Sequence, residues 1–271
     1  MTRHEYQLPD GGVLSWLEAG EGPPLVLLHG WSLSGNAFAE LAGLLDGFRL
    51  LLPDLPGHGR STPLPGATLP AMAGWIAAWL TDVAPGPVLL GGWSLGGMVA
   101  LELAARQSVP IDRLMLIGTT PRFTTGPDWQ HGLPDTQVRA LRRNLERSFE
   151  ATLGSFFNLT FAPGEIDPSR LRAIQNVAVR PGGPPDRETA AACLGLLAEQ
   201  DQRALLPAIA CPTLVVHGAL DAVTPVGAGR ALAAVLPLGR LHEINDAGHA
   251  PHWTRPQDVA KAITEFCAWD R

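Results

Sequence analysis

A glycine-flanked serine is the residue whose position most clearly predicts chemistry. Ser94 lies in Gly92-Trp93-Ser94-Leu95-Gly96-Gly97, a G-x-S-x-G pattern that follows an apolar run and opens a stretch with helical spacing. This pattern is typical of a sharp strand-to-helix turn that presents the serine hydroxyl above a sheet edge, close to a helix N-terminus. A serine placed there can act as the nucleophile of an acyl transfer. The alternative is a glycine-rich turn in which the serine is incidental.

His249 is the candidate base for this serine. A serine hydroxyl is a weak nucleophile at neutral pH until a neighbouring base accepts its proton, so a partner histidine is required. His249 lies in Asp246-Ala247-Gly248-His249-Ala250-Pro251, a loop that follows the last expected strand and therefore meets the sheet edge of Ser94. The chain order serine, acid, histidine, which goes with this type of serine turn, selects His249 among the 8 histidines.

Asp221 is the candidate acid that orients the histidine and stabilises its cation. It follows the penultimate expected strand, in His217-Gly218-Ala219-Leu220-Asp221. Asp246 is nearer to His249 along the chain, but three residues of loop rarely align two such side chains, so we expect Asp246 to point elsewhere. The other position for the acid, after the apolar run that ends near Gly118, holds two threonines. A turn-capping function is the alternative for Asp221.

Two backbone amides could stabilise the oxyanion that forms during acyl transfer. The N–H of Leu95 stands at the start of the expected helix, where amide groups have no helical acceptor. The N–H of Trp31, in His29-Gly30-Trp31-Ser32, could point at the same oxygen because the glycine allows a close backbone approach. The side chain of Trp31 could pack as an ordinary aromatic residue without conflict, since only its backbone is used.

The elements that must position these residues alternate in type. Short apolar runs end in tight turns, and stretches with helical spacing lie between them, which is the pattern of a mostly parallel sheet with helices on both faces. The expected strands are residues 25–28, 50–52, 88–90, 114–117, 213–216 and 240–244. The expected helices are residues 69–83, 95–106, 226–236 and 256–269.

A long segment in the middle of the chain interrupts this alternation. It has no strand pattern, and its helical stretches are broken by segments such as Arg180-Pro181-Gly182-Gly183-Pro184-Pro185. An insertion between two parallel strands lies over the carboxyl ends of the strands, where open α/β sheets bind ligands. We therefore expect residues 1–120 and 207–271 to form one α/β core and residues 121–206 to form a helical lid.

Composition excludes several classes of function. The chain has 271 residues, of which 46% are hydrophobic, so it can bury a large core. Its net charge of -6 argues against nucleic acid or an anionic membrane as partner, and no apolar run is long enough to span a membrane. Lys261 is the only lysine, which disfavours a P-loop or a Schiff base. The 3 cysteines form no C-x-x-C pair and the chain shows no leader pattern, so we expect a cytoplasmic protein. We also expect it to be a monomer without metal or cofactor.

These motifs, with Asp54-Leu55-Pro56-Gly57-His58-Gly59-Arg60-Ser61, resemble the α/β-hydrolase superfamily along nearly the whole chain. The resemblance implies the α/β-hydrolase fold, with a mostly parallel central sheet flanked by helices and an inserted helical lid. It also implies a catalytic triad of Ser94, Asp221 and His249. Haloalkane dehalogenases and epoxide hydrolases of this superfamily have Asp at the position of Ser94, so their chemistry is disfavoured.

Three details are similar to one family within the superfamily, the pimeloyl-acyl carrier protein methyl ester esterases of biotin synthesis. A tryptophan precedes Ser94 and a Gly-Trp pair lies in the oxyanion loop; Thr119-Thr120-Pro121-Arg122-Phe123 is followed by Asp128-Trp129; and the lid is compact and helical. The resemblance implies a serine carboxylesterase that hydrolyses the methyl ester of pimeloyl-acyl carrier protein, with acyl carrier protein as partner. The residues that would contact the acyl chain, or else form lid core, are Trp31, Phe156, Phe157, Leu159 and Thr160.

A basic stripe on the expected lid is a local exception on this acidic chain. Its four arginines are spaced by three and four residues, so a helix would place them along one side. They could dock an acidic carrier protein or its phosphopantetheine phosphate, or they could form a solvated face balanced by Glu146 and Glu150. The arginines that hold the carrier in the resembled family align slightly later, near Thr152 and Ser155. The stripe consists of Arg139, Arg142, Arg143 and Arg147.

Two other functions remain open from the sequence. A broad-specificity carboxylesterase or a carbon-carbon bond hydrolase acting on small acyl substrates would use the same triad. A non-catalytic binding protein of this fold would not need an intact nucleophile, base and acid, and covalent labelling by a fluorophosphonate would distinguish it from an enzyme.

Overall fold

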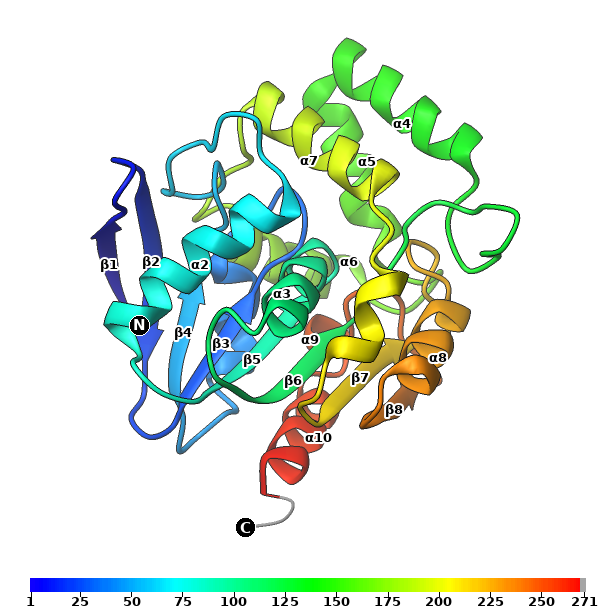
Figure 1. The fold of residues 1–271 in the computed structure, drawn as a ribbon. Helices are drawn as coiled ribbons and strands as arrows, with labels where there is room; N and C mark the ends of the chain where they lie inside the picture. Colours follow the sequence, from blue (N-terminus) through cyan, green and yellow to red (C-terminus); the bar gives the residue numbers. More distant parts are fainter. Residues whose placement is uncertain (269–271) are drawn as a thin grey trace.

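A sheet of 8 strands runs through the centre of the protein (Figure 1), whose computed structural model describes residues 1–268. The strand order is β1-β2-β4-β3-β5-β6-β7-β8. All pairs from β4 to β8 are parallel, whereas β1 pairs with β2, and β2 with β4, in antiparallel fashion. The strands are β1 (Thr2–Gln7), β2 (Val13–Ala19), β3 (Pro24–Leu28), β4 (Arg49–Pro53), β5 (Val88–Trp93), β6 (Ile111–Ile117), β7 (Thr213–Gly218) and β8 (Gly239–Ile244).

Helices cover both faces of the sheet and a further group lies above its upper edge in Figure 1. The α-helices are α1 (Ala39–Ala42), α2 (Leu69–Val83), α3 (Leu95–Arg106), α4 (Asp135–Arg147), α5 (Phe149–Leu159), α6 (Pro168–Ile174), α7 (Arg187–Glu199), α8 (Val226–Val235), α9 (Pro251–Thr254) and α10 (Pro256–Ala268). Two 3-10 helices, η1 (Gly35–Phe38) and η3 (Arg203–Ala208), and a π-helix, η2 (Gln175–Val179), complete the set.

The apolar runs of the sequence form strands because both of their faces are buried. In β3, Val26 and Leu28 belong to the buried apolar cluster that includes residues of α2 and α3, whereas Leu25 and Leu27 belong to a second cluster that includes residues of α1, α9 and α10. All four side chains are 0% exposed. Each buried leucine stabilises the folded state by about 1.5–3 kcal/mol relative to an exposed one. The buried strands therefore hold the sheet in place, and the sheet positions the loops at its carboxyl edge.

Two strands at the amino-terminal edge were not expected from the sequence. Strand β1 is a polar edge strand with little buried surface, so it lacks the apolar run that identifies the central strands. Strands β1 and β2 form a hairpin around Asp10 and Gly11, the latter with a φ of 87°. Of the expected closing helix 256–269, residues 256–268 form α10, and Trp269 lies outside the described residues.

Helices α4 to α7 lie between β6 and β7 in the chain, in the segment where a lid is expected. Only isolated bridges, such as Arg122 with Asp201, occur among residues 121–206, in keeping with the absence of a strand pattern. Among residues 1–268, no helix has both the length and the apolar character needed to cross a membrane.

Candidate active site

Ser94 occupies a sharp turn between β5 and α3. Its φ of 54° and ψ of -116° are unfavourable for a residue with a side chain, and such strain is typical of functional turns. The flanking glycines are required because a Cβ on Gly96 would lie 2.1 Å from the carbonyl oxygen of Leu28, and one on Gly92 would lie 2.3 Å from that of Gly96. The pattern G-x-S-x-G therefore follows from the close approach of three backbone segments.

Asp221 and His249 come together from the loops after β7 and β8. His249 Nδ1 lies 2.8 Å from Asp221 Oδ2, and both residues are buried. The other carboxylate oxygen, Oδ1, accepts hydrogen bonds of 2.8 Å from the amides of Val223 and Thr224. These amides fix the carboxylate, which in turn fixes the imidazole, so that His249 Nε2 is left as the nitrogen available to another partner.

Thr224 and His217 also contact this pair and were not identified from the sequence. Thr224 Oγ1 lies 2.8 Å from Asp221 Oδ2 and 3.2 Å from His249 Nδ1. His217 Nε2 lies 2.7 Å from the carbonyl oxygen of Thr224 and 3.3 Å from Asp221 Oδ2, which requires a proton on that nitrogen. Neither contact has a sequence signature, because each depends on how the loop after β7 folds back on the strand.

The surroundings of Asp221 keep its carboxylate ionised. Burial alone would raise the pKa of Asp221, but the charge of His249 and the hydrogen bonds from His217 and His249 prevail and hold that pKa well below its usual range. An ionised acid can stabilise an imidazolium at His249 when that residue accepts a proton.

Leu95 and Trp31, whose amides are expected at the oxyanion site, lie next to Ser94 in the chain and on the wall of the same cavity as Ser94, respectively. Leu95 opens α3, and Trp31 follows β3 in the neighbouring loop. The indole of Trp31 donates a hydrogen bond of 3.0 Å to the carbonyl oxygen of Ala190, and its ring meets that of Phe156 edge-on at 4.8 Å. The Trp31 side chain therefore packs against the lid helices, while its backbone belongs to the loop beside the nucleophile.

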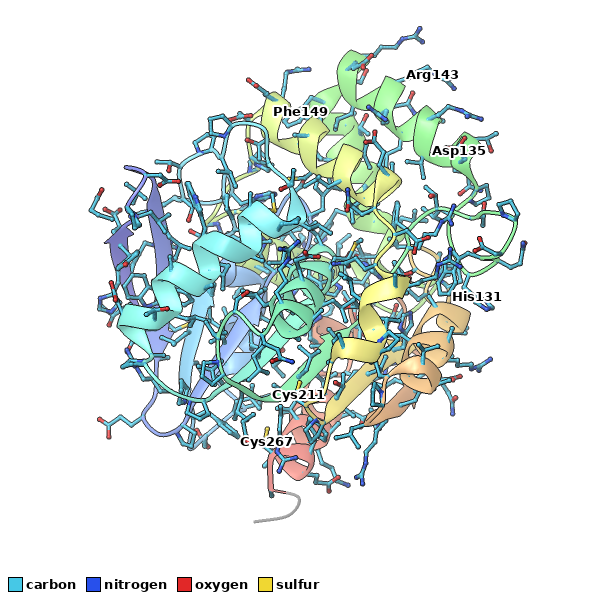
Figure 2. The ribbon with its side chains drawn as sticks, viewed as in Figure 1. His131, Asp135, Arg143, Phe149, Cys211 and Cys267 are labelled. Carbon is cyan, nitrogen blue, oxygen red and sulfur yellow. The ribbon has the colours of Figure 1, made fainter. Side chains whose placement is uncertain are left out.

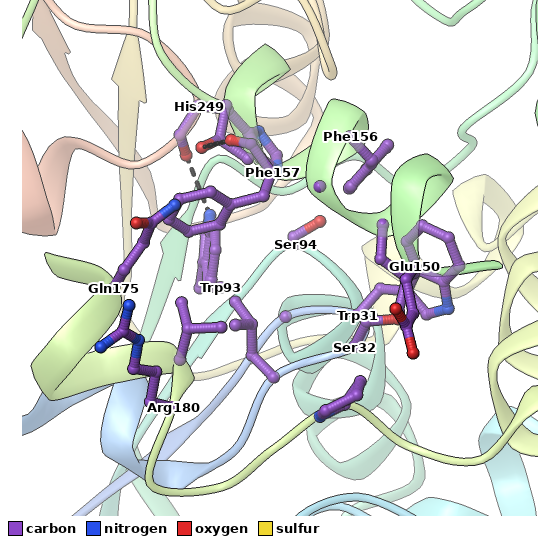
Figure 3. Close-up of a pocket in the computed structure, with 17 residues that line it drawn as sticks. Trp31, Ser32, Trp93, Ser94, Glu150, Phe156, Phe157, Gln175, Arg180 and His249 are labelled. Carbon is purple, nitrogen blue, oxygen red and sulfur yellow. Dashed lines mark hydrogen bonds between the residues drawn. The ribbon is translucent and has the colours of Figure 1, made fainter. Parts of the chain in front are cut away.

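A cavity of about 360 Å³ joins these groups (Figure 3). Figure 3 shows the side chain of Ser94 pointing into it, and His249 lies on its wall. Most of the lining is apolar. The lining residues that the sequence predicted for substrate contact are Trp31, Phe156, Phe157 and Thr160, and those it missed include Trp93, Glu150, Leu153, Gln175, Val179 and Arg180.

The expectation for Leu159 does not agree with its position. Leu159 is 44% exposed and lines a second cavity, between α4 and α5, instead of the cavity that contains Ser94. Leu159 is the last residue of α5. Phe157, two residues earlier on the same helix, lines the first cavity, whereas Leu159 does not. Leu159 is therefore not brought together with the candidate nucleophile.

The four arginines of the basic stripe lie on α4 and are all exposed, whereas Val138 and Leu145 of the same helix are buried. Figure 2 shows Arg143 and Asp135 at the outer surface of this helix. Arg139 pairs with Asp135, and Arg142 lies 3.6 Å from Glu199. Arg143 and Arg147 have no carboxylate within ion-pair distance in the described part of the chain, and Arg147 borders the second cavity.

Other titratable groups near the site do not belong to the group formed by Ser94, Asp221 and His249. Asp246 points away from His249 and forms an ion pair of 2.7 Å with Arg255. His29 and His252 are fully buried, and burial lowers the pKa of His29 to about 4 and that of His252 to about 3, so both are neutral at pH 7. Over residues 1–268, no group of three or more His, Cys, Asp or Glu side chains could hold a metal ion.

The chain is similar to known proteins over most of its length. The family model described as alpha/beta hydrolase fold matches residues 23–256. The pimeloyl-acyl carrier protein methyl ester esterase of Chromobacterium violaceum is 40% identical over 247 residues, which is 91% of this chain and 94% of the relative. The enzyme of the same name from Nitrosomonas europaea is 37% identical over 90% of this chain and 95% of its own length.

Solved structures give the same result for the fold. An esterase from Exiguobacterium antarcticum superposes with a TM-score of 0.89 at 25% identity, covering 97% of this chain and 98% of that protein. A thermophilic esterase from Thermogutta terrifontis superposes with a TM-score of 0.82 at 29% identity, covering 98% of each chain. The fold class predicted from the sequence is thus confirmed.

Proposed function

Because the chain belongs to the α/β-hydrolase fold family, we propose that it is a serine carboxylesterase that hydrolyses the methyl ester of pimeloyl-acyl carrier protein to methanol and pimeloyl-acyl carrier protein. The observation that carries the proposal is the 2.8 Å contact of Asp221 with His249 on the wall of the cavity that contains Ser94. The named relatives at 37% to 40% identity support the substrate.

In the first half of the reaction, Ser94 Oγ attacks the ester carbonyl as His249 Nε2 accepts its proton. Asp221 stabilises the resulting imidazolium through the hydrogen bond to Nδ1. The backbone amides of Trp31 and Leu95 donate to the oxyanion of the tetrahedral intermediate. The imidazolium then gives its proton to the departing methoxide oxygen, which leaves as methanol, and the acyl group remains on Ser94.

In the second half, water takes the place of methanol. His249 accepts a proton from the water as it attacks the acyl carbonyl, and the same two amides hold the second oxyanion. Collapse of this intermediate breaks the bond to Ser94, and His249 returns the proton to the serine oxygen. The free acid is released, and the chain's own residues supply every proton transfer.

The lining of the catalytic cavity suits an acyl chain. Trp31, Phe156 and Phe157 offer apolar surface to the methylene groups of an acyl chain, and Thr160 adds a hydroxyl group to the lining of the cavity. We assign these residues to substrate binding and leave Leu159 out of the set. The carrier protein would remain outside, on the lid, where the exposed arginines of α4 offer positive charge to an acidic partner. A monomeric state and a cytoplasmic location are part of the same proposal.

The first experiment tests catalysis. Purified wild-type protein should hydrolyse p-nitrophenyl butyrate and be labelled by a fluorophosphonate, whereas Ser94→Ala should lose both properties. Ser108→Ala, at an exposed position after α3, is the matched control and should keep them. Retention of activity by Ser94→Ala would reject the mechanism, and the absence of labelling in the wild type would favour a non-catalytic binding protein.

The second experiment tests the substrate. The chain should restore growth without biotin to a bacterial strain that lacks its pimeloyl-carrier methyl esterase, and Ser94→Ala should not. An active esterase that is well expressed and fails to restore growth would favour the broad-specificity carboxylesterase.

A further inference from the structure

The loop that presents His249 is hydrogen-bonded to the lid. We call residues 245–250, between β8 and α9, the base loop. The amide of Gly248 donates to Glu165 Oε1 at 2.9 Å, and the amide of His249 donates to the carbonyl oxygen of Thr160 at 2.8 Å. Two successive N–H groups of the base loop therefore find their acceptors in a lid segment that lies about eighty residues earlier in the chain.

Glu165 connects this lid segment to the base loop through both of its carboxylate oxygens. While Oε1 accepts from Gly248, Oε2 accepts a hydrogen bond of 2.6 Å from the amide of Ala162. The amide of Glu165 in turn donates to the carbonyl oxygen of Ala162 at 3.0 Å, which closes a tight turn. Hydrogen bonds to an ionised acceptor are roughly twice as strong as neutral ones, so this carboxylate is a firm anchor.

The contact is too close to be incidental. A Cβ on Gly248 would lie 2.7 Å from the carbonyl oxygen of Thr160 and 2.8 Å from Glu165 Oε2. The base loop thus needs glycine at this position to approach the lid segment. The distances also show that the loop has no free space on that side in which to relax.

Other contacts also hold the base loop: the imidazole of His249 contacts Asp221 at 2.8 Å, and the carbonyl oxygen of Ala247 accepts a hydrogen bond of 3.0 Å from the amide of Leu220. The carbonyl oxygen of His249 accepts from the indole of Trp93 at 2.9 Å, and Asp246 is paired with Arg255. These contacts hold the carbonyl side of His249 and the start of the loop. The amide side of His249 is held by the lid segment, and within residues 1–268 Glu165 is the one side chain that takes part there.

We propose that Glu165 is a positioning residue for His249: by binding the amide of Gly248, it holds the base loop against the lid and sets the imidazole in line with Ser94. Glu165 does not line the catalytic cavity, so it acts through the loop and does not touch substrate. The inference rests on the proposed function, because it presupposes that His249 is the base. A lid that moves would, by these contacts, move the base with it.

The test compares kcat and KM for p-nitrophenyl butyrate in the full-length protein. Glu165→Ala removes both acceptors and should lower kcat about 10-fold, since misplacement of a catalytic group by about 1 Å can cost up to about 100-fold, while KM stays within about twofold. Glu165→Gln keeps one acceptor oxygen, which can serve Gly248, but presents an NH2 group to the amide of Ala162, so it should recover only part of the loss. Glu188→Gln, an exposed carboxylate on α7, is the matched control and should leave both constants unchanged.

The inference is overturned if Glu165→Ala keeps kcat within about twofold of the wild type. Circular dichroism verifies that each variant is folded at the assay temperature. If Glu165→Ala does not fold, Glu165→Asp replaces it in the comparison, because it keeps the charge but shortens the reach to Gly248. Ser94→Ala separates the two proposals: an active Ser94→Ala rejects the proposed function, whereas an inactive Ser94→Ala beside a fully active Glu165→Ala rejects this inference alone.

Discussion

The indole N–H of Trp93 donates a hydrogen bond of 2.9 Å to the carbonyl oxygen of His249. Trp93 ends β5 and directly precedes Ser94, so the strand that presents the candidate nucleophile also holds the loop of the candidate base. The ring is buried and packs edge-on against His252 at 4.6 Å and Trp253 at 4.9 Å. Ser94 and His249 are therefore tied together by one rigid side chain.

Replacement of Trp93 by Phe should impair catalysis more than it impairs folding. The change keeps an aromatic ring but leaves the carbonyl oxygen of His249 buried without its donor, so the base can shift. We expect kcat for p-nitrophenyl butyrate to fall about 10-fold. Trp79→Phe is the matched control, because the Trp79 indole nitrogen is buried without a partner in the described chain and its ring packs against Trp16 and does not line the catalytic cavity. Equal kcat in the two variants would contradict this view of Trp93.

The choice between Asp221 and Asp246 as the acid can be tested by the same substitution at each position. Asp221→Asn removes the charge that stabilises the imidazolium, and kcat should fall by about 1,000- to 10,000-fold. Asp246→Asn removes only an exposed ion pair with Arg255, which solvent screens, so kcat should stay near that of the wild type. The reverse pattern in steady-state kinetics would assign the orienting function to Asp246.

The sequence predicts the central fold because the strands that build it are buried on both faces. Runs such as residues 25–28 and 214–216 are continuously apolar for this physical reason, and they locate the turns that follow them. Ser94 and Asp221 lie after such runs, and His249 follows the less apolar strand β8; because all three strands are parallel, the meeting of these residues at one sheet edge could be inferred without coordinates. The edge strand β1 lacks the signal, since little of its surface is buried.

Contacts made by loops could not be inferred in this way. Thr224 reaches Asp221 and Glu165 reaches Gly248 because short segments fold back on themselves, and no periodicity describes such turns. The sequence is equally unable to predict which side of a lid helix faces the catalytic cavity, because α5 has a cavity on each of two sides. Leu159 was for that reason placed with Phe157, although the two residues lie on different cavities.

Three buried histidines make the folded protein sensitive to mild acid. Burial lowers the pKa of His29 to about 4 and those of His58 and His252 to about 3, from a usual value of 6.5. Below pH 6.5 these histidines therefore bind protons in the unfolded chain but stay neutral in the folded chain. The free energy of unfolding accordingly falls as the pH falls from 6.5 toward 4. Between pH 6 and pH 5 each histidine should lower the free energy of unfolding by about 1 kcal/mol, which urea denaturation at the two pH values can measure.

His252→Phe isolates one of these contributions. Both ring nitrogens of His252 are buried without a hydrogen-bond partner in residues 1–268, among the rings of Phe38, Trp93 and Trp253. Phenylalanine fits an aromatic site and removes the cost of burying two polar atoms, so the free energy of unfolding at pH 7 should rise by about 1–2 kcal/mol. The gain should be larger at pH 5 than at pH 7. A pH-independent difference would show that His252 does not titrate on unfolding.

Charge reversal on α4 tests where the carrier protein docks. Arg143 and Arg147 are exposed and unpaired in the described chain, so Arg143→Glu and Arg147→Glu place negative charge on the face proposed for an acidic partner. Each should raise KM for the carrier-linked methyl ester by about 5- to 10-fold at low salt, with less effect at high salt, and should leave p-nitrophenyl butyrate hydrolysis unchanged. Lys261→Glu, on α10 at the opposite end of the molecule (Figure 1), is the matched control. If all three variants keep the wild-type KM for the carrier-linked ester, the arginines form a solvated face and the carrier docks elsewhere.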